Sequence, residues 1–169
     1  MRSVVLSFGA CLFACGGEEP TAMRPSVFIA VASSFEGYPA FTHFSLSAGD
    51  EAGSVHTAGP RELYINALPP AGSTSFPVGT IIVKTVSATD QTFAMVKRGG
   101  GYNAVGATGW EWFELKSLPS GLAILWRGIT PPSGEHYSGT QGGACNDCHA
   151  AARDNDFVRS TALNLGALK

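Results

Sequence analysis

Two cysteines and a histidine stand together near the C-terminus, in the pentapeptide Cys145-Asn146-Asp147-Cys148-His149. Two thiols separated by two residues and followed at once by a histidine form the attachment sequence for c-type haem. Each thiol adds to one haem vinyl group, and the adjacent imidazole reaches the iron as the proximal ligand. The spacing therefore predicts one covalently attached haem c, held by Cys145 and Cys148, with His149 on the iron.

Three other uses of this cysteine pair stay open at this point. A thiol–disulfide redox site is one, although no thioredoxin-like βαβ pattern precedes the pair. Half of a zinc site is another, although the sequence has no second C-x-x-C or Cys/His pair to complete four ligands. A structural disulfide, which suits an oxidising compartment, is the third.

The N-terminus has the layout of a bacterial export signal, with one positive charge at Arg2 before an apolar stretch. Leu12-Phe13-Ala14-Cys15 resembles the lipobox of bacterial lipoproteins, and Cys11 fits that pattern less well. We expect a signal peptide over 1–14, a lipidated Cys15 and a polar tether over 15–25, and a buried N-terminal helix is the alternative. This predicts a lipid-anchored protein at the periplasm or cell surface, where bacterial c-type haem is attached.

The composition excludes several classes of protein. The 169 residues carry 11 Lys and Arg against 13 Asp and Glu, and 14% are charged while 44% are hydrophobic. That balance is too apolar for a disordered chain and lacks the basic patch of a nucleic-acid-binding protein. The longest apolar run, about a dozen residues at the N-terminus, is too short to span a membrane. With 21 Gly and 10 Pro, the chain has the many turns of a β-rich fold.

The elements that must position the pentapeptide are mostly strands. A short strand is expected over 61–66, and β-branched or alternating residues predict four more over 80–86, 92–97, 110–115 and 122–127. Short turns between these four indicate an antiparallel meander. We expect the pentapeptide to start a helix over 144–153 and a second helix to follow over 154–168, while 27–32 is a strand or short helix and 33–44 is ambiguous. The fold class is α+β and β-dominated, a twisted antiparallel sheet with a few short helices in one domain over 26–169.

Lys84 interrupts the apolar strand over 80–86. Alternation places it on one face with Thr80, Ile82 and Val86, and the intervening residues on the other. A lysine in such a strand must reach solvent, pair with a charge or react. A lysine at a sheet edge is the ordinary interpretation, and a reactive amine is the functional one.

Six ordered motifs span about residues 60 to 160: Tyr64-Ile65-Asn66, Phe76-Pro77-Val78-Gly79-Thr80-Ile81-Ile82-Val83-Lys84, Ala94-Met95-Val96-Lys97, Gly109-Trp110-Glu111-Trp112-Phe113, the pentapeptide, and Asp156-Phe157-Val158. Through these motifs the chain resembles the cytochrome P-460 family, which includes the cytochromes c′-beta. The resemblance implies a twisted antiparallel sheet, a homodimer, and a five-coordinate haem with His149 proximal and the sheet on the distal side. In the hydroxylamine-oxidising members, a lysine at the position of Lys84 is bonded to the porphyrin edge.

One departure concerns the distal side. The oxidising members carry a distal carboxylate, and aligning Val96-Lys97 places Phe93 at that position. A phenylalanine-lined pocket is instead the feature of the gas-binding cytochromes c′-beta, which lack the lysine cross-link. Arg61 is a candidate distal cation, although an exposed arginine is its ordinary interpretation.

Three functions follow from these expectations. The first is an oxidoreductase that acts on hydroxylamine or nitric oxide at an open iron and exchanges electrons with a partner cytochrome. The second is a binding protein that sequesters or senses nitric oxide in an apolar pocket. The third is an electron-transfer cytochrome with Met95 as sixth ligand, for which His43, His56 and His136 are alternatives.

Overall fold

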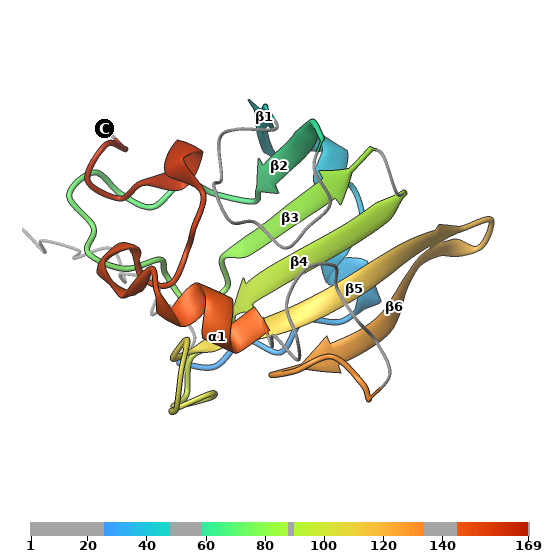
Figure 1. The fold of residues 1–169 in the computed structure, drawn as a ribbon. Helices are drawn as coiled ribbons and strands as arrows, with labels where there is room; N and C mark the ends of the chain where they lie inside the picture. Colours follow the sequence, from blue (N-terminus) through green and yellow to red (C-terminus); the bar gives the residue numbers. More distant parts are fainter. Residues whose placement is uncertain (1–25, 48–58, 88–89, 134–144, 169) are drawn as a thin grey trace, which may run out of the picture.

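The described part of the protein is built on an antiparallel meander. The computed structural model describes residues 26–47, 59–87, 90–133 and 145–168. Its strands are β1 (Thr42–Leu46), β2 (Arg61–Ile65), β3 (Ile81–Val86), β4 (Gln91–Lys97), β5 (Trp110–Leu118) and β6 (Gly121–Gly128). They pair in chain order into one twisted six-stranded sheet, as Figure 1 shows, so the expected β-dominated α+β fold is confirmed.

The five predicted strands are all present, and β1 is an additional strand that the sequence left ambiguous. β1 is an edge strand whose residues are largely exposed, so it lacks the continuous apolar signal of a central strand. The predicted signal peptide over 1–14, the tether over 15–25 with Cys15, and the histidines His56 and His136 lie outside the described residues.

The segments that flank the sheet are short. The segment 27–32 does not form a strand of the sheet and contributes one isolated bridge, from Val27 to Gly99. It leads into the 3-10 turns η1 (Ala32–Phe35) and η2 (Tyr38–Ala40). After the sheet come α1 (Cys145–Ala150) and the 3-10 turns η3 (Arg153–Asn155) and η4 (Thr161–Leu163).

The prediction of a second helix over 154–168 is wrong, because the segment contains only the short turns η3 and η4. Asp156 and Phe157 take left-handed backbone angles, with φ of 48° and 68°, and this reverses the chain directly after η3. A right-handed helix cannot continue through such residues. The segment therefore folds as short turns, and its Val158, Leu163 and Leu165 pack into the core with the sheet.

The two ends of the described chain pack on opposite faces of the sheet, and α1 lies over one end of the strands (Figure 1). The N-terminal segment packs on one face, where Phe35 and Ala30 meet Val83 and Phe113. The C-terminal segment packs on the other face, which we call the α1 face. Its buried core comprises Leu46, Leu63, Ile65, Phe76, Ile82, Met95, Ala107, Trp110, Trp112, Trp126, Phe157, Val158, Leu163 and Leu165, and Cys145 packs against it.

The alternation predicted for β3 is confirmed by this division, because Ile82 lies in the α1-face core while Ile81 and Val83 lie in the core of the opposite face. Lys84 and Val86 share the face of Ile82. In the described part of the chain, no helix is long and apolar enough to cross a membrane.

Candidate functional site

Helix α1 carries the whole pentapeptide, since Cys145-Asn146-Asp147-Cys148-His149 are its first five residues. Asn146 attaches this short helix to the loop before β5. Its Oδ1 accepts hydrogen bonds from Asn103 Nδ2 at 2.6 Å and from the Ala107 amide at 3.2 Å. Its Nδ2 donates to Asn103 Oδ1 at 2.9 Å and to the Val105 carbonyl at 3.1 Å. The pair of amide side chains therefore fixes α1 against the sheet.

Gly106 makes room for this attachment. A Cβ at residue 106 would lie 2.5 Å from Asn146 Nδ2, and the φ of Gly106 is +103°. Both the space and the backbone angle require glycine at this position. The roles of Asn146 and Gly106 could not be predicted from the sequence, because the contact joins a loop and a helix far apart in the chain.

The two thiols of the pentapeptide are free and form no disulfide with each other. Burial raises the pKa of the Cys145 thiol to about 11, and the charge of Lys84 acts in the opposite direction. Cys148 Sγ accepts a hydrogen bond from Arg159 Nη1 at 3.1 Å, and the same guanidinium nitrogen donates to the Cys148 carbonyl at 2.9 Å. The structure thus places two free thiols three residues apart on α1.

His149 is held in one tautomer. Its Nδ1 lies 2.7 Å from the Phe157 carbonyl oxygen, and because a carbonyl only accepts, Nδ1 must carry the proton. Burial lowers the pKa of His149 to about 4, with smaller contributions from the charges of Lys84 and Arg159. The imidazole is therefore neutral at physiological pH, and its Nε2 keeps a lone pair.

His149 lies against the sheet through Trp112 of β5, with ring centroids 4.4 Å apart. Trp112 is 3% exposed, and in the described part of the chain its Nε1 has no hydrogen-bond acceptor. A buried donor without an acceptor is unusual in a folded protein and marks a place where a ligand can accept. The imidazole and this indole N–H therefore belong to one site.

A continuous row of side chains crosses the α1 face beside this site. The strand register pairs Leu63 with Lys84, Lys84 with Phe93, Phe93 with Glu114 and Glu114 with Trp126. The neighbouring row brings Ile82, Met95 and Trp112 together in the same way. Lys84, Phe93 and Met95, which the sequence singled out, therefore share the face on which His149 lies.

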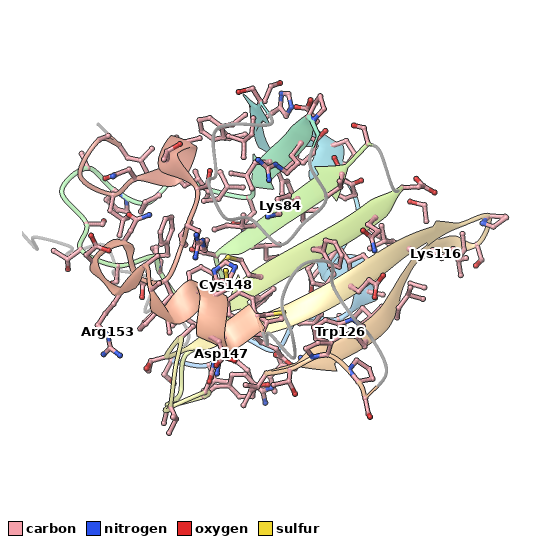
Figure 2. All side chains as sticks on the ribbon, viewed as in Figure 1. Lys84, Lys116, Trp126, Asp147, Cys148 and Arg153 are labelled. Atoms are coloured by element: carbon pink, nitrogen blue, oxygen red, sulfur yellow. The ribbon has the colours of Figure 1, made fainter. Side chains whose placement is uncertain are left out.

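The structure corrects the ordinary interpretation of Lys84. β3 lies between β2 and β4, so Lys84 is on an interior strand and not at a sheet edge. Its side chain is partly buried, and its charge affects the pKa values of both Cys145 and His149. Figure 2 shows Lys84 on β3 and Cys148 on α1 on the same side of the sheet.

The ordinary interpretation of Arg61 as an exposed arginine is also wrong, because Arg61 is buried, with 1% of its surface exposed. It shares the α1 face with Leu63 and Ile65, and its Nη2 donates to the Ser47 carbonyl at 3.3 Å. His43 is not part of the site: it stacks on Tyr64 at the opposite face of the sheet and bonds to Glu62. A role for His43 as sixth ligand is therefore wrong.

Glu114 is the residue that sequence reasoning missed on this face. It lies directly across from Phe93, and its Oε2 accepts a hydrogen bond from Trp126 Nε1 at 3.0 Å. The signal was present, since Glu114 follows Trp112 by two residues and alternation places both on one face. The α1 face thus offers a carboxylate next to Phe93.

Within the described residues, no group of three or more His, Cys, Asp and Glu side chains lies close enough to hold a metal ion. No protein-family model matches the chain, and no curated protein and no solved structure matches it either. A function must therefore be assigned from these residues and their geometry.

Proposed function

We propose that the chain is a mono-haem c-type cytochrome that takes up a small nitrogen oxide, such as nitric oxide or hydroxylamine, at an open iron position. The observation that carries this proposal is the state of His149. Its Nδ1–H is committed to the Phe157 carbonyl, so the lone pair lies on Nε2, and the free thiols of Cys145 and Cys148 belong to the same short helix. A neutral imidazole fixed through its other nitrogen is the usual form of a metal-binding histidine.

The residues present fit a haem. Cys145 and Cys148 supply the two thiols that thioether attachment needs, and His149 supplies the axial nitrogen. The buried Nε1 of Trp112, without an acceptor in the described residues, fits a ligand that carries hydrogen-bond acceptors, and haem propionates are such acceptors. The core side chains of the α1 face, on which His149 lies, are apolar, as are the two faces of a porphyrin ring.

When bound, the haem supplies an iron that takes a small ligand and exchanges electrons. The chain supplies the surroundings. Phe93 and Met95 are buried and offer an apolar surface that excludes water, while Glu114 offers a hydrogen-bond acceptor beside them. Lys84 offers an amine on the same row, and its interior position supports the porphyrin cross-link that the family resemblance implies for it.

A second candidate function is electron transfer with Met95 as the sixth ligand. The observation that favours it is the register, which places Met95 directly across from Trp112, the residue on which His149 lies. A thioether in that position would close the iron to other ligands and raise the haem potential.

Nitric oxide binding distinguishes these two functions. The protein is produced together with c-haem maturation factors, reduced, and mixed with nitric oxide while the visible spectrum is followed. We expect the unsubstituted protein and Met95→Leu, which conserves the side-chain volume, to bind at the same rate. Faster binding by Met95→Leu would mean that Met95 caps the iron and would replace the proposed function by electron transfer.

Turnover separates the two forms of the proposal. Oxidation of hydroxylamine in the presence of an electron acceptor would identify an oxidoreductase, and binding without turnover would identify a nitric oxide carrier or sensor. Export and lipidation at Cys15 stay predictions of the sequence, and they agree with haem attachment outside the cytoplasm.

A further inference from the structure

Asp156 directly precedes Phe157, whose carbonyl accepts the hydrogen bond from His149. Three groups donate hydrogen bonds to Asp156. Its Oδ1 accepts from Lys97 Nζ at 2.6 Å, and its Oδ2 accepts from the Phe76 amide at 2.8 Å. Its backbone carbonyl accepts from Trp110 Nε1 at 2.7 Å. With 9% of its surface exposed, Asp156 is a buried carboxylate with both oxygens occupied.

These contacts hold the backbone of Asp156 and Phe157 in a conformation that is unfavourable for residues other than glycine. Asp156 has φ of 48° and Phe157 has φ of 68°, and a bulky aromatic residue rarely adopts such an angle. Such a conformation persists only where the surrounding structure imposes it. Here the reversal turns the Phe157 carbonyl back toward α1, where it accepts from His149 Nδ1 at 2.7 Å.

Lys97 is built into this arrangement from β4. Its side chain is 13% exposed, its Nζ also donates to the Thr108 carbonyl at 3.2 Å, and it lies over the Trp110 ring. Gly109 makes room for it, since a Cβ there would lie 3.2 Å from Lys97 Cε. Lys97 is thus a packed cation and not a surface lysine that meets a carboxylate in solvent.

We propose that Asp156, anchored by Lys97, is a positioning residue for His149: it fixes the Phe157 carbonyl that sets the tautomer and direction of the imidazole. The inference rests on the proposed function for its meaning, because a haem iron would be the partner of Nε2. Substitution of the groups that bond to the second ring nitrogen of a metal-binding histidine typically lowers metal affinity by about 10- to 100-fold. A weaker hydrogen bond from Nδ1–H to the Phe157 carbonyl also makes the imidazole a poorer electron donor to iron. This favours the reduced state of the haem iron.

The test compares two substitutions with two matched controls. Asp156→Asn keeps the size of the side chain and tolerates left-handed angles but removes the charge, and Lys97→Met removes the cation from the other side. Asp154→Asn and Lys116→Met make the same chemical changes at exposed positions. Lys97→Met also serves if Asp156→Asn does not fold.

Two measurements decide the outcome. In the haem-free protein, the nitrogen resonances of His149 report its tautomer, and we expect both substitutions but neither control to populate the other tautomer. In the haem-loaded protein, we expect both to raise the reduction potential by about 59 mV, a tenfold change in the reduced-to-oxidised ratio for one electron. Unfolding measurements show how far each variant is destabilised.

A loss of stability with unchanged His149 resonances and an unchanged potential would overturn the inference and leave Asp156 a purely structural residue. A protein that takes up no haem would overturn the proposed function instead. The haem-free resonances would still decide whether Asp156 positions His149.

Discussion

Lowering the pH from 7.5 to 5 should destabilise the haem-free protein through His149. Burial lowers the pKa of this imidazole from 6.5 to about 4, so the unfolded chain binds a proton in a range where the folded protein does not. Stability therefore rises with pH between about 4 and 6.5 and is lost as the pH falls through this window. Each pH unit in the window corresponds to about 1.36 kcal/mol.

Between pH 6.5 and pH 5 this amounts to about 2 kcal/mol. With a urea dependence of about 2 kcal/mol per molar, the midpoint of unfolding should fall by about 1 M. The pKa of Glu62 is lowered below 4.5 by the Ser45 hydroxyl and by His43. Its contribution to the free energy of unfolding is therefore lost only below pH 4.5, outside the range of this experiment.

The assay is urea unfolding of the haem-free, reduced protein at both pH values, with His149→Asn and His43→Asn beside it. The amide introduced by His149→Asn can still donate to the Phe157 carbonyl but cannot bind a proton, so the pH effect should shrink in that variant. His43 contacts Glu62 and Tyr64 on the opposite face of the sheet from His149, so His43→Asn should leave the loss of stability caused by His149 in place. If His149→Asn retains the full loss of stability at pH 5, the assignment of a buried, neutral His149 is refuted.

Three further predictions concern single positions. Glu111→Gln should lower the free energy of unfolding by about 3 kcal/mol, because the buried carboxylate binds Arg127 through two hydrogen bonds of 2.7 and 2.8 Å, and calorimetry measures the loss. Gly106→Ala should reduce the fraction of protein that acquires haem, while Gly101→Ala, which has a φ of +73° but nothing within 4 Å of the added carbon, should not; equal haem content in both would contradict the role of that loop. Lys84→Ala should change the visible spectrum of the haem-loaded protein, and an identical spectrum would rule out a bond from Lys84 to the porphyrin.

The sheet could be predicted where its strands are central. The β-branched run at β3 has a strong period-two pattern, and the prediction placed Lys84 and Ile82 on the correct common face. β1 was missed because an edge strand has few buried positions and therefore a weak pattern. Arg61 was misjudged for a related reason, since alternation in β2 indicates which residues share a face but not that a charged one is buried there.

The conformation of the C-terminal segment could not be predicted from the sequence. The composition of 154–168 is compatible with a helix, but the backbone at Asp156 and Phe157 is set by contacts with Lys97 and Trp110, far away in the chain. Left-handed angles at residues other than glycine depend on such tertiary contacts. For the same reason the pentapeptide could be recognised from its spacing, while its attachment through Asn146 could not.

We propose that Cys145, Cys148 and His149 hold one haem. The most direct measurement is the absorption spectrum of the protein made with c-haem maturation factors, taken before and after denaturation and solvent extraction of free haem. Haem bands should survive extraction in the unsubstituted protein and be lost by extraction in Cys145→Ser/Cys148→Ser, because covalent attachment depends on the two thiols. An unsubstituted protein without haem bands, or one whose haem is fully extracted, would contradict covalent haem attachment at these residues.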